Sequence, residues 1–263
     1  MQTSLIICLI FFLVLLIALE RLHSIKIILR IIVSLAIVYG YIQAIINGLS
    51  IVLSSTTTAI LLVTTNVLIK NGFKRRTITE ILSVLVVSGI TSLMVFFICK
   101  SEGLKMYQDE ILIFNGLKKT ENVMFSIFLI GTLGIYMDIV SRVIFRLHEQ
   151  KDQTVDVPWK EQFKQGIDIG QKYIGEKINN MSLVLIVVAL LPICVTLNRD
   201  VGITDAFNQP DIFSYLLITI VASIGIVISA PITAVAYATI NRKKTIYKTT
   251  SENKVDGKRS LKL

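Results

Sequence analysis

The segment VMFSIFLIGTLGIYMDIVSRVIF, residues 123–145, is the most informative in the chain. It is almost wholly apolar, and its only charged side chains are Asp138 and Arg142. The hydrocarbon core of a bilayer is about 30 Å thick, so a helix that crosses it needs roughly 20 mainly apolar residues. The segment therefore predicts a membrane-spanning helix that carries one acid inside an apolar block.

The rest of the chain has the same character. Of its 263 residues 53% are hydrophobic and 17% charged, and the mean hydropathy is +0.71. These values exclude a soluble globular domain, a disordered chain and a disulfide-stapled scaffold. We expect an all-α, polytopic membrane helix bundle over residues 1–241, with about seven transmembrane helices. They are predicted at residues 2–19, 27–46, 51–69, 81–99, 123–145, 178–197 and 212–240.

Lysine and arginine predict the orientation of these spans, because cytoplasmic loops carry an excess of both residues. If the N-terminus lies outside, 22 of the 27 basic residues fall on the inner side, many of them in the tail 242–263. We therefore expect a multi-pass protein of the cell (plasma) membrane with a basic cytoplasmic tail. The net charge of +9 then reflects topology and the lipid bilayer, and we expect no nucleic-acid partner.

Two features flank the spans. Residues 159–177 place apolar side chains on one face and charged ones on the other, which predicts an amphipathic helix at the cytoplasmic interface that runs into the next span. The sequence Thr77-Ile78-Thr79-Glu80 has the pattern of a capping box, in which Thr77 and Glu80 satisfy free N–H groups at a helix start.

Asp138 is the main candidate site residue. An ionisable group in hydrocarbon costs several kcal/mol (about 3 or more) unless it is paired, hydrated or protonated, so it indicates a functional site. One interpretation is that Asp138 lines a polar path or binds a proton or cation. The alternative is that it pairs with Arg142, one turn further inward. Gly131 and Gly134 share its stripe, which predicts close approach of a neighbouring helix.

Other polar or small residues inside apolar segments complete the candidate set. The hydroxyls of Thr57 and Thr64, seven residues apart, and the amide of Asn179 either pack or line the same path. Gly170 is a candidate for helix packing, and Pro231 for a kink that frees a backbone carbonyl. Convergence of Asp138, Thr57, Thr64 and Asn179 on one cavity would favour transport.

No enzyme motif is visible. The chain has two histidines and three scattered cysteines, no HExxH sequence, no phosphate-binding GxxxxGK[ST] loop and no second membrane aspartate to pair with Asp138. We expect no catalysis, no metal and no cofactor.

Three separated blocks resemble the YibE/F family. They are Gly131-Thr132-Leu133-Gly134 followed by Asp138, then Gly166-Ile167-Asp168-Ile169-Gly170, and finally Ser223-Ile224-Gly225-Ile226-Val227 with Ala230-Pro231-Ile232-Thr233-Ala234. The chain departs from the family pattern at Gln171-Lys172, where an Arg-Asp pair is expected. Its length is more similar to the shorter, YibF-type members.

The resemblance implies a membrane complex with a longer YibE-like companion; a homo-oligomer is the other assembly we consider. Two functions follow from these observations. The first is a transporter or transport-complex subunit of unknown substrate. The second is a non-transporting scaffold or assembly partner, which would be favoured if Asp138 points to the lipid side or to cytoplasmic solvent and pairs with Arg142.

Overall fold

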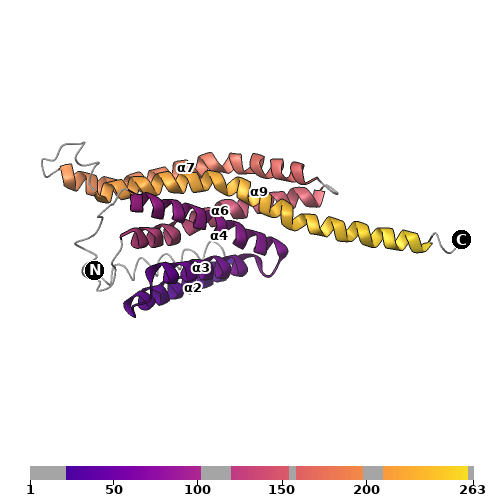
Figure 1. Ribbon diagram of the computed structural model, residues 1–263, viewed down its shortest axis with the longest axis horizontal. Coiled ribbons are helices and arrows are strands. Elements are labelled where there is room, and N and C mark those ends of the chain that lie inside the picture. The colour runs from indigo at the N-terminus through magenta and orange to yellow at the C-terminus, as the bar shows by residue number, and fades with distance from the viewer. Residues whose placement is uncertain (1–21, 102–119, 154–157, 198–209, 260–263) are drawn as a thin grey trace.

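The computed structural model describes residues 22–101, 120–153, 158–197 and 210–259. This part of the chain is entirely helical, as the sequence predicts (Figure 1). The helices are α2 (Leu22–Ile46), α3 (Ile51–Asn71), α4 (Arg75–Ser101), α6 (Thr120–Gln153), α7 (Trp159–Leu197) and α9 (Pro210–Arg259).

Five segments of the described residues are long and apolar enough to cross a membrane. They are Ile25–Ile46, Ile51–Asn71, Arg75–Ser101, Asn122–Gln150 and Leu216–Ile240. The predicted span over 2–19 lies outside the described residues, and residues 178–197 form the second half of α7. The fold is therefore a membrane helix bundle, and the described part accounts for five of the seven expected spans.

Two glycines with positive φ follow helix ends, one after α2 and one after α3. Gly48 has φ +83° in the tight turn that joins α2 to α3, the hairpin that Asn47 to Ser50 indicate. Gly72 has φ +67° after α3, and its N–H donates to the carbonyl of Leu68 at 2.8 Å. Both values lie in the left-handed region, which glycine adopts without a steric penalty.

α6 lies at the centre of the packing. It packs on α3, α4, α7 and α9, while α2 packs chiefly on α3 at the edge of the bundle (Figure 1). The largest fully buried side chains come mainly from α6, among them Phe128, Tyr136 and Ile139. Many apolar side chains on the outer faces remain exposed, such as Leu35 on α2 and Phe97 on α4, as helices need when they face lipid.

The amphipathic segment 159–177 runs into the next predicted span, as the sequence indicates. It is continuous with residues 178–197 in α7, which packs along α9 (Figure 1). A β-carbon on Gly166 would lie 2.5 Å from Ala234 Cβ, and one on Gly170 would lie 2.2 Å from Ala230 Cβ. Glycine at both positions lets the two helices approach closely. The face of this segment that carries Gly166 and Gly170 therefore packs against α9.

The capping box is wrong as a prediction. α4 begins at Arg75, so Thr77 lies inside the helix, where its hydroxyl donates to the carbonyl of Gly72 at 2.8 Å. Glu80 is buried and points away from the helix start, toward other helices. The tight turn at Gly72 to Lys74 satisfies the first N–H groups instead, for example Thr77 N–H to the carbonyl of Lys74 at 2.9 Å.

α9 runs through Pro231 as one helix and extends to Arg259, into the predicted tail (Figure 1). Proline has no N–H, so the carbonyl of Val227 lacks its usual helical partner. Ser229 and Thr233 are buried beside Pro231 and donate to carbonyls of the preceding turn, at 2.6 Å each. Hydroxyls of this kind help a membrane helix tolerate proline.

Candidate polar site around α6

Asp138 forms ion pairs with two cations. Its Oδ1 lies 3.1 Å from Arg142 Nε, one turn along α6, and its Oδ2 contacts Lys177 Nζ from α7. The Asp138 side chain is 40% exposed and the Lys177 side chain 17% exposed. Arg142 also lies over the ring of Tyr173, 5.6 Å from its centroid. Asp138 therefore holds α6 to α7 in addition to its pair with Arg142.

A first cavity of about 550 Å³ lies on the α7 side of Asp138. Its walls are mostly apolar, and its polar groups are Asp138, Thr132, Lys177 and Asn180. A volume of this size, with apolar walls and a few convergent polar groups, is typical of small-molecule sites.

A second cavity, of about 400 Å³, lies on the other side of Asp138, between α2, α3 and α6. It is more polar than the first. Its ionisable or hydrogen-bonding lining residues are Arg30, Ser34, Asn66, Lys70, Asp138 and Ser141. Within it the amide of Asn66 donates to Ser34 Oγ at 3.0 Å and to the carbonyl of Leu62 at 2.8 Å.

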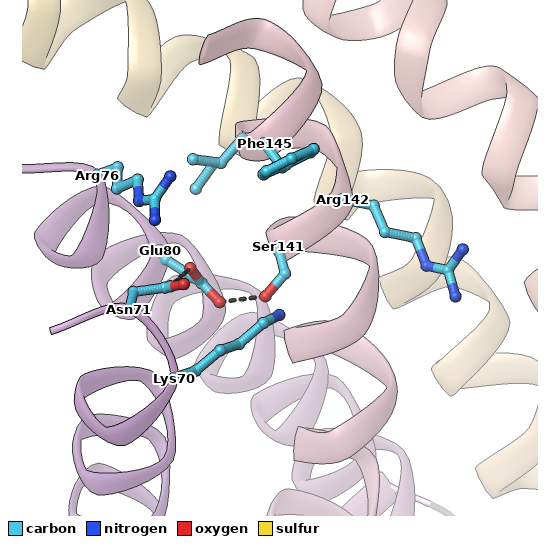
Figure 2. A pocket seen from close by; sticks show the side chains of 8 residues that line it. Lys70, Asn71, Arg76, Glu80, Ser141, Arg142 and Phe145 are labelled. Atoms are coloured by element: carbon cyan, nitrogen blue, oxygen red, sulfur yellow. Dashed lines mark hydrogen bonds between the residues drawn. The ribbon is translucent and has the colours of Figure 1, made fainter. Parts of the chain in front are cut away.

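A third cavity, of about 190 Å³, adjoins the second and shares Lys70 and Ser141 with it. Its carboxylate is Glu80, which is 2% exposed. Glu80 accepts hydrogen bonds from Asn71 Nδ2 at 2.7 Å and from Ser141 Oγ (Figure 2). These contacts join α3, α4 and α6 at one carboxylate.

Figure 2 shows that Lys70 and Arg76 reach toward Glu80, whereas Arg142 points away from it. Neither Lys70 nor Arg76 makes an ion pair with a described carboxylate at contact distance. The third cavity therefore contains one hydrogen-bonded acid and two cations that lie near it without pairing with it.

Sequence reasoning missed Glu80 and Lys177. The capping-box pattern gave Glu80 a local role, and its partner Ser141 lies 61 residues away. Lys177 shares the packed face of α7 with the half-buried Ile174 and the buried Met181. A lone lysine on an apolar helical face was the signal available for it.

Gly131 and Gly134 correct the expectation of close helix packing at the α6 stripe. A β-carbon added to either would meet nothing within 4 Å. Both glycines line the first cavity, and Gly134 lines the second as well. The absence of side chains there widens the cavities, whereas the close approach occurs at Gly170 and at Gly225, where an added β-carbon would lie 2.2 Å from Tyr136 Oη.

The other predicted polar residues do not join Asp138. Thr57 is exposed, and its hydroxyl donates to the carbonyl of Leu53 at 2.9 Å. Thr64 is half-buried on α3, and Asn179 is exposed; neither lines any of the three cavities. Instead, Asn66 on α3 lines the second cavity and Asn180 on α7 lines the first. Pro231 lines none of the three cavities.

Within the described ranges, no three His, Cys, Asp or Glu side chains come together as metal ligands would. The polar groups around α6 are cations, amides, hydroxyls and two separated carboxylates. Such groups suit hydrogen bonding and charge pairing with a solute, and hard metal ions prefer clustered carboxylate oxygens.

The fold and the site define a class: a polytopic helical membrane protein whose helices form cavities lined by a few charged side chains. The YibE/F-like protein family model matches residues 8–243, so the chain belongs to the YibE/F family. The match extends over both halves of the chain. No match to the sequence is found among curated proteins or among solved structures.

Proposed function

We propose that this chain is a membrane transporter or a subunit of a transport complex, and that its solute passes through the cavities around Asp138. The observation that carries the proposal is the position of Asp138. It lines a cavity on each side of α6, and it lies within the candidate span Asn122–Gln150.

Charged side chains inside a membrane bundle favour this function. Arg30, Lys70 and Asp138 all line the second cavity, and all lie within candidate spans. Ionisable groups at such positions are expensive in lipid and typically mark the pathways of ions and solutes. The open space at Gly131 and Gly134 supplies room for a solute beside Asp138.

A second candidate function is a non-transporting scaffold. The contact of Asp138 with Arg142 at 3.1 Å and its 40% exposure favour it, because a half-exposed, paired acid has no need of a transported ligand. The absence of Thr57, Thr64 and Asn179 from the cavities points the same way. In this function the bundle only holds a companion chain in the membrane.

The companion is part of the proposal. We place the chain with the shorter, YibF-type members and propose that it assembles with a YibE-like membrane protein, or otherwise with copies of itself. Neither function involves a catalytic step. We propose a location in the cell membrane with the N-terminus outside, since 22 of 27 basic residues then face the cytoplasm.

Co-purification tests the assembly. The full chain would be extracted from its own membranes in a mild detergent, and bound chains and small molecules identified by mass spectrometry. We expect a YibE-like protein at a fixed stoichiometry. A preparation that holds only this chain and lipid, as a monomer, would contradict both assemblies.

Flux tests the function. The purified complex would be placed in proteoliposomes, and uptake of the co-purified small molecules measured beside a panel of inorganic ions. Asp138→Asn should abolish uptake while the complex still assembles, because the carboxylate is removed without loss of volume. Thr57→Ala is the matched control and should leave uptake unchanged. Equal uptake by the Asp138→Asn complex would contradict transport through this site, and no uptake by the intact complex would favour the scaffold.

A reagent that cannot cross the membrane tests orientation. A single cysteine introduced into residues 242–263, in a variant without the native cysteines, should stay unlabelled on intact cells and react after lysis. Labelling on intact cells would reverse the proposed topology.

A further inference from the structure

We propose that the cavity between α2, α3 and α6 binds an anionic group with oxygen acceptors, of the phosphate or carboxylate class, through Arg30 and Lys70. The inference rests on the proposed function only in treating the cavity as a solute site. It adds the chemical class of the ligand, and binding can be measured without transport.

Charge balance is the first argument. Together the three cavities are lined by the cations Arg30, Lys70, Arg76, Arg142 and Lys177 and by the carboxylates Asp138 and Glu80. Both oxygens of Asp138 are already engaged, by Arg142 and Lys177. The lining therefore has an excess of three positive charges, and Asp138 is already paired with two of the five cations.

Unpartnered donors are the second argument. Arg30 Nε and Arg76 Nε are both buried without a hydrogen-bond partner. Arg30 lines the second cavity, Arg76 lines the third, and Lys70 lines both. A buried polar group without a partner is unfavourable because it has lost its hydrogen bonds to water, so an acceptor in the cavity would relieve that cost.

The geometry of donors suits an oxyanion. A guanidinium presents several N–H groups in a planar fork that matches carboxylate and phosphate oxygens, and a lysine ammonium adds a point charge. The hydroxyl of Ser34 accepts from Asn66 and keeps its own proton to donate. A volume of about 400 Å³ holds a small anion or a lipid headgroup.

A positively charged membrane cavity has two sources of such an anion: a free solute and the headgroup of an anionic lipid. Both are recognised by the same Arg30 and Lys70 donors. Their depth allows either, because Arg30 lies five residues into the candidate span Ile25–Ile46 and Lys70 is next to the last residue of Ile51–Asn71.

The test uses the full chain, delipidated in a maltoside detergent. Inorganic phosphate, acetate and short-chain phosphatidylglycerol would be titrated separately, with heat of binding and thermal unfolding as readouts. We expect Arg30→Gln and Lys70→Gln each to weaken binding at least tenfold. Lys26→Gln and Lys74→Gln, which remove exposed lysines near the same helix ends and outside the cavity, are the matched controls and should bind as the unmodified chain does.

Each outcome of the titrations supports or overturns the anion site. Binding of phosphate or acetate that depends on Arg30 supports the site with a free anion as ligand. Binding of phosphatidylglycerol alone, again dependent on Arg30, supports the site with a lipid headgroup as ligand. No binding of any probe, or binding that Arg30→Gln and Lys70→Gln leave unchanged, overturns the inference.

Arg30→Lys keeps the inference testable if Arg30→Gln does not fold. It retains the charge and loses the planar fork, so it should bind several-fold more weakly while it elutes as the unmodified chain does on size exclusion. Absence of uptake by the unmodified complex in proteoliposomes, with anion binding intact, would contradict transport and leave the anion site standing.

Discussion

Two carboxylates lie at opposite faces of α6 in opposite settings: Glu80, which belongs to α4, and Asp138 of α6 itself. Toward α4, Glu80 is 2% exposed and is held by the neutral side chains of Asn71 and Ser141. Toward α7, Asp138 is 40% exposed and is paired with Arg142 and Lys177. The packing of α6 also varies along its length, since Tyr136 fits tightly against Gly225 of α9 while Gly131, which lines the first cavity with Asp138, faces open space.

The comparison separates structure from function. A deeply buried acid bound by neutral donors stabilises the helices that supply those donors, because each loses a partner if the acid is removed. A half-exposed acid between cations at a cavity contributes little to folding, since water screens the pair, and it remains accessible to a solute. Glu80 is thus the structural acid, and Asp138 the one suited to function.

Glu80→Ala should have the largest effect on stability. It leaves Asn71 and Ser141 without the acceptor they share and removes the carboxylate from the cavity that Lys70 and Arg76 line. We expect a loss of about 2–3 kcal/mol in the free energy of unfolding, measured in mixed micelles. Glu80→Gln keeps an acceptor oxygen and the same length, so it should lose less. An alanine variant as stable as the unmodified chain would end the distinction between the two acids.

Gly225→Ala should come next. The added methyl would overlap the fully buried ring of Tyr136, and overpacking of this kind costs about 1–3 kcal/mol. Gly131→Ala is the matched control within the same bundle. Its methyl enters the first cavity and meets no atom within 4 Å, so it should raise the free energy of unfolding by about 0.4–1 kcal/mol, because alanine loses less backbone entropy than glycine on folding. Thermal unfolding of the two variants measures the difference. An equal loss of stability in both would contradict the contrast between tight packing at Gly225 and open space at Gly131.

Asp138→Asn should destabilise the chain by less than about 1 kcal/mol, because its ion pairs are half-exposed. A double-mutant cycle with Lys177→Gln measures the coupling between the two side chains across α6 and α7. We expect a coupling free energy of about 0.5 kcal/mol. A value as large as the Glu80→Ala loss would make Asp138 a structural acid as well.

Thr57→Ala should have the smallest effect. Its hydroxyl donates to the carbonyl of Leu53 in its own helix, on an exposed surface of the described bundle. We expect a change within about 0.5 kcal/mol in the free energy of unfolding. A larger loss would mean that Thr57 contacts a companion chain.

Helix identity could be predicted from the sequence, whereas the site could be predicted only in part. Apolar length alone indicates α2, α3, α4 and α6, and Asn47 to Ser50 indicate their first hairpin. Asp138 stands out because it is the one acid in its apolar block. Its contact with Lys177 depends on how α6 meets α7, which local patterns do not contain.

Glu80 shows the same limit more clearly. The four residues Thr77 to Glu80 predict a local role for it as a helix cap. In the structure it is buried and accepts hydrogen bonds from Ser141 on α6 and Asn71 on α3. Likewise, Gly131 and Gly170 look alike in a sequence, and only the neighbouring helix determines that one faces a cavity and the other faces Ala230. Pairing of helices distant in the chain decides both cases.

The unbroken course of α7 has a mechanical consequence. Gly166, where α7 approaches α9 closely, and Lys177, whose ammonium contacts Asp138, belong to the same continuous helix. The two residues are about 16 Å apart along its axis at 1.5 Å per residue. Any tilt of α7 against α9 therefore shifts Lys177 relative to Asp138 in the same movement. The position of α7 therefore controls both the width of the first cavity and the strength of the ion pair between Asp138 and Lys177.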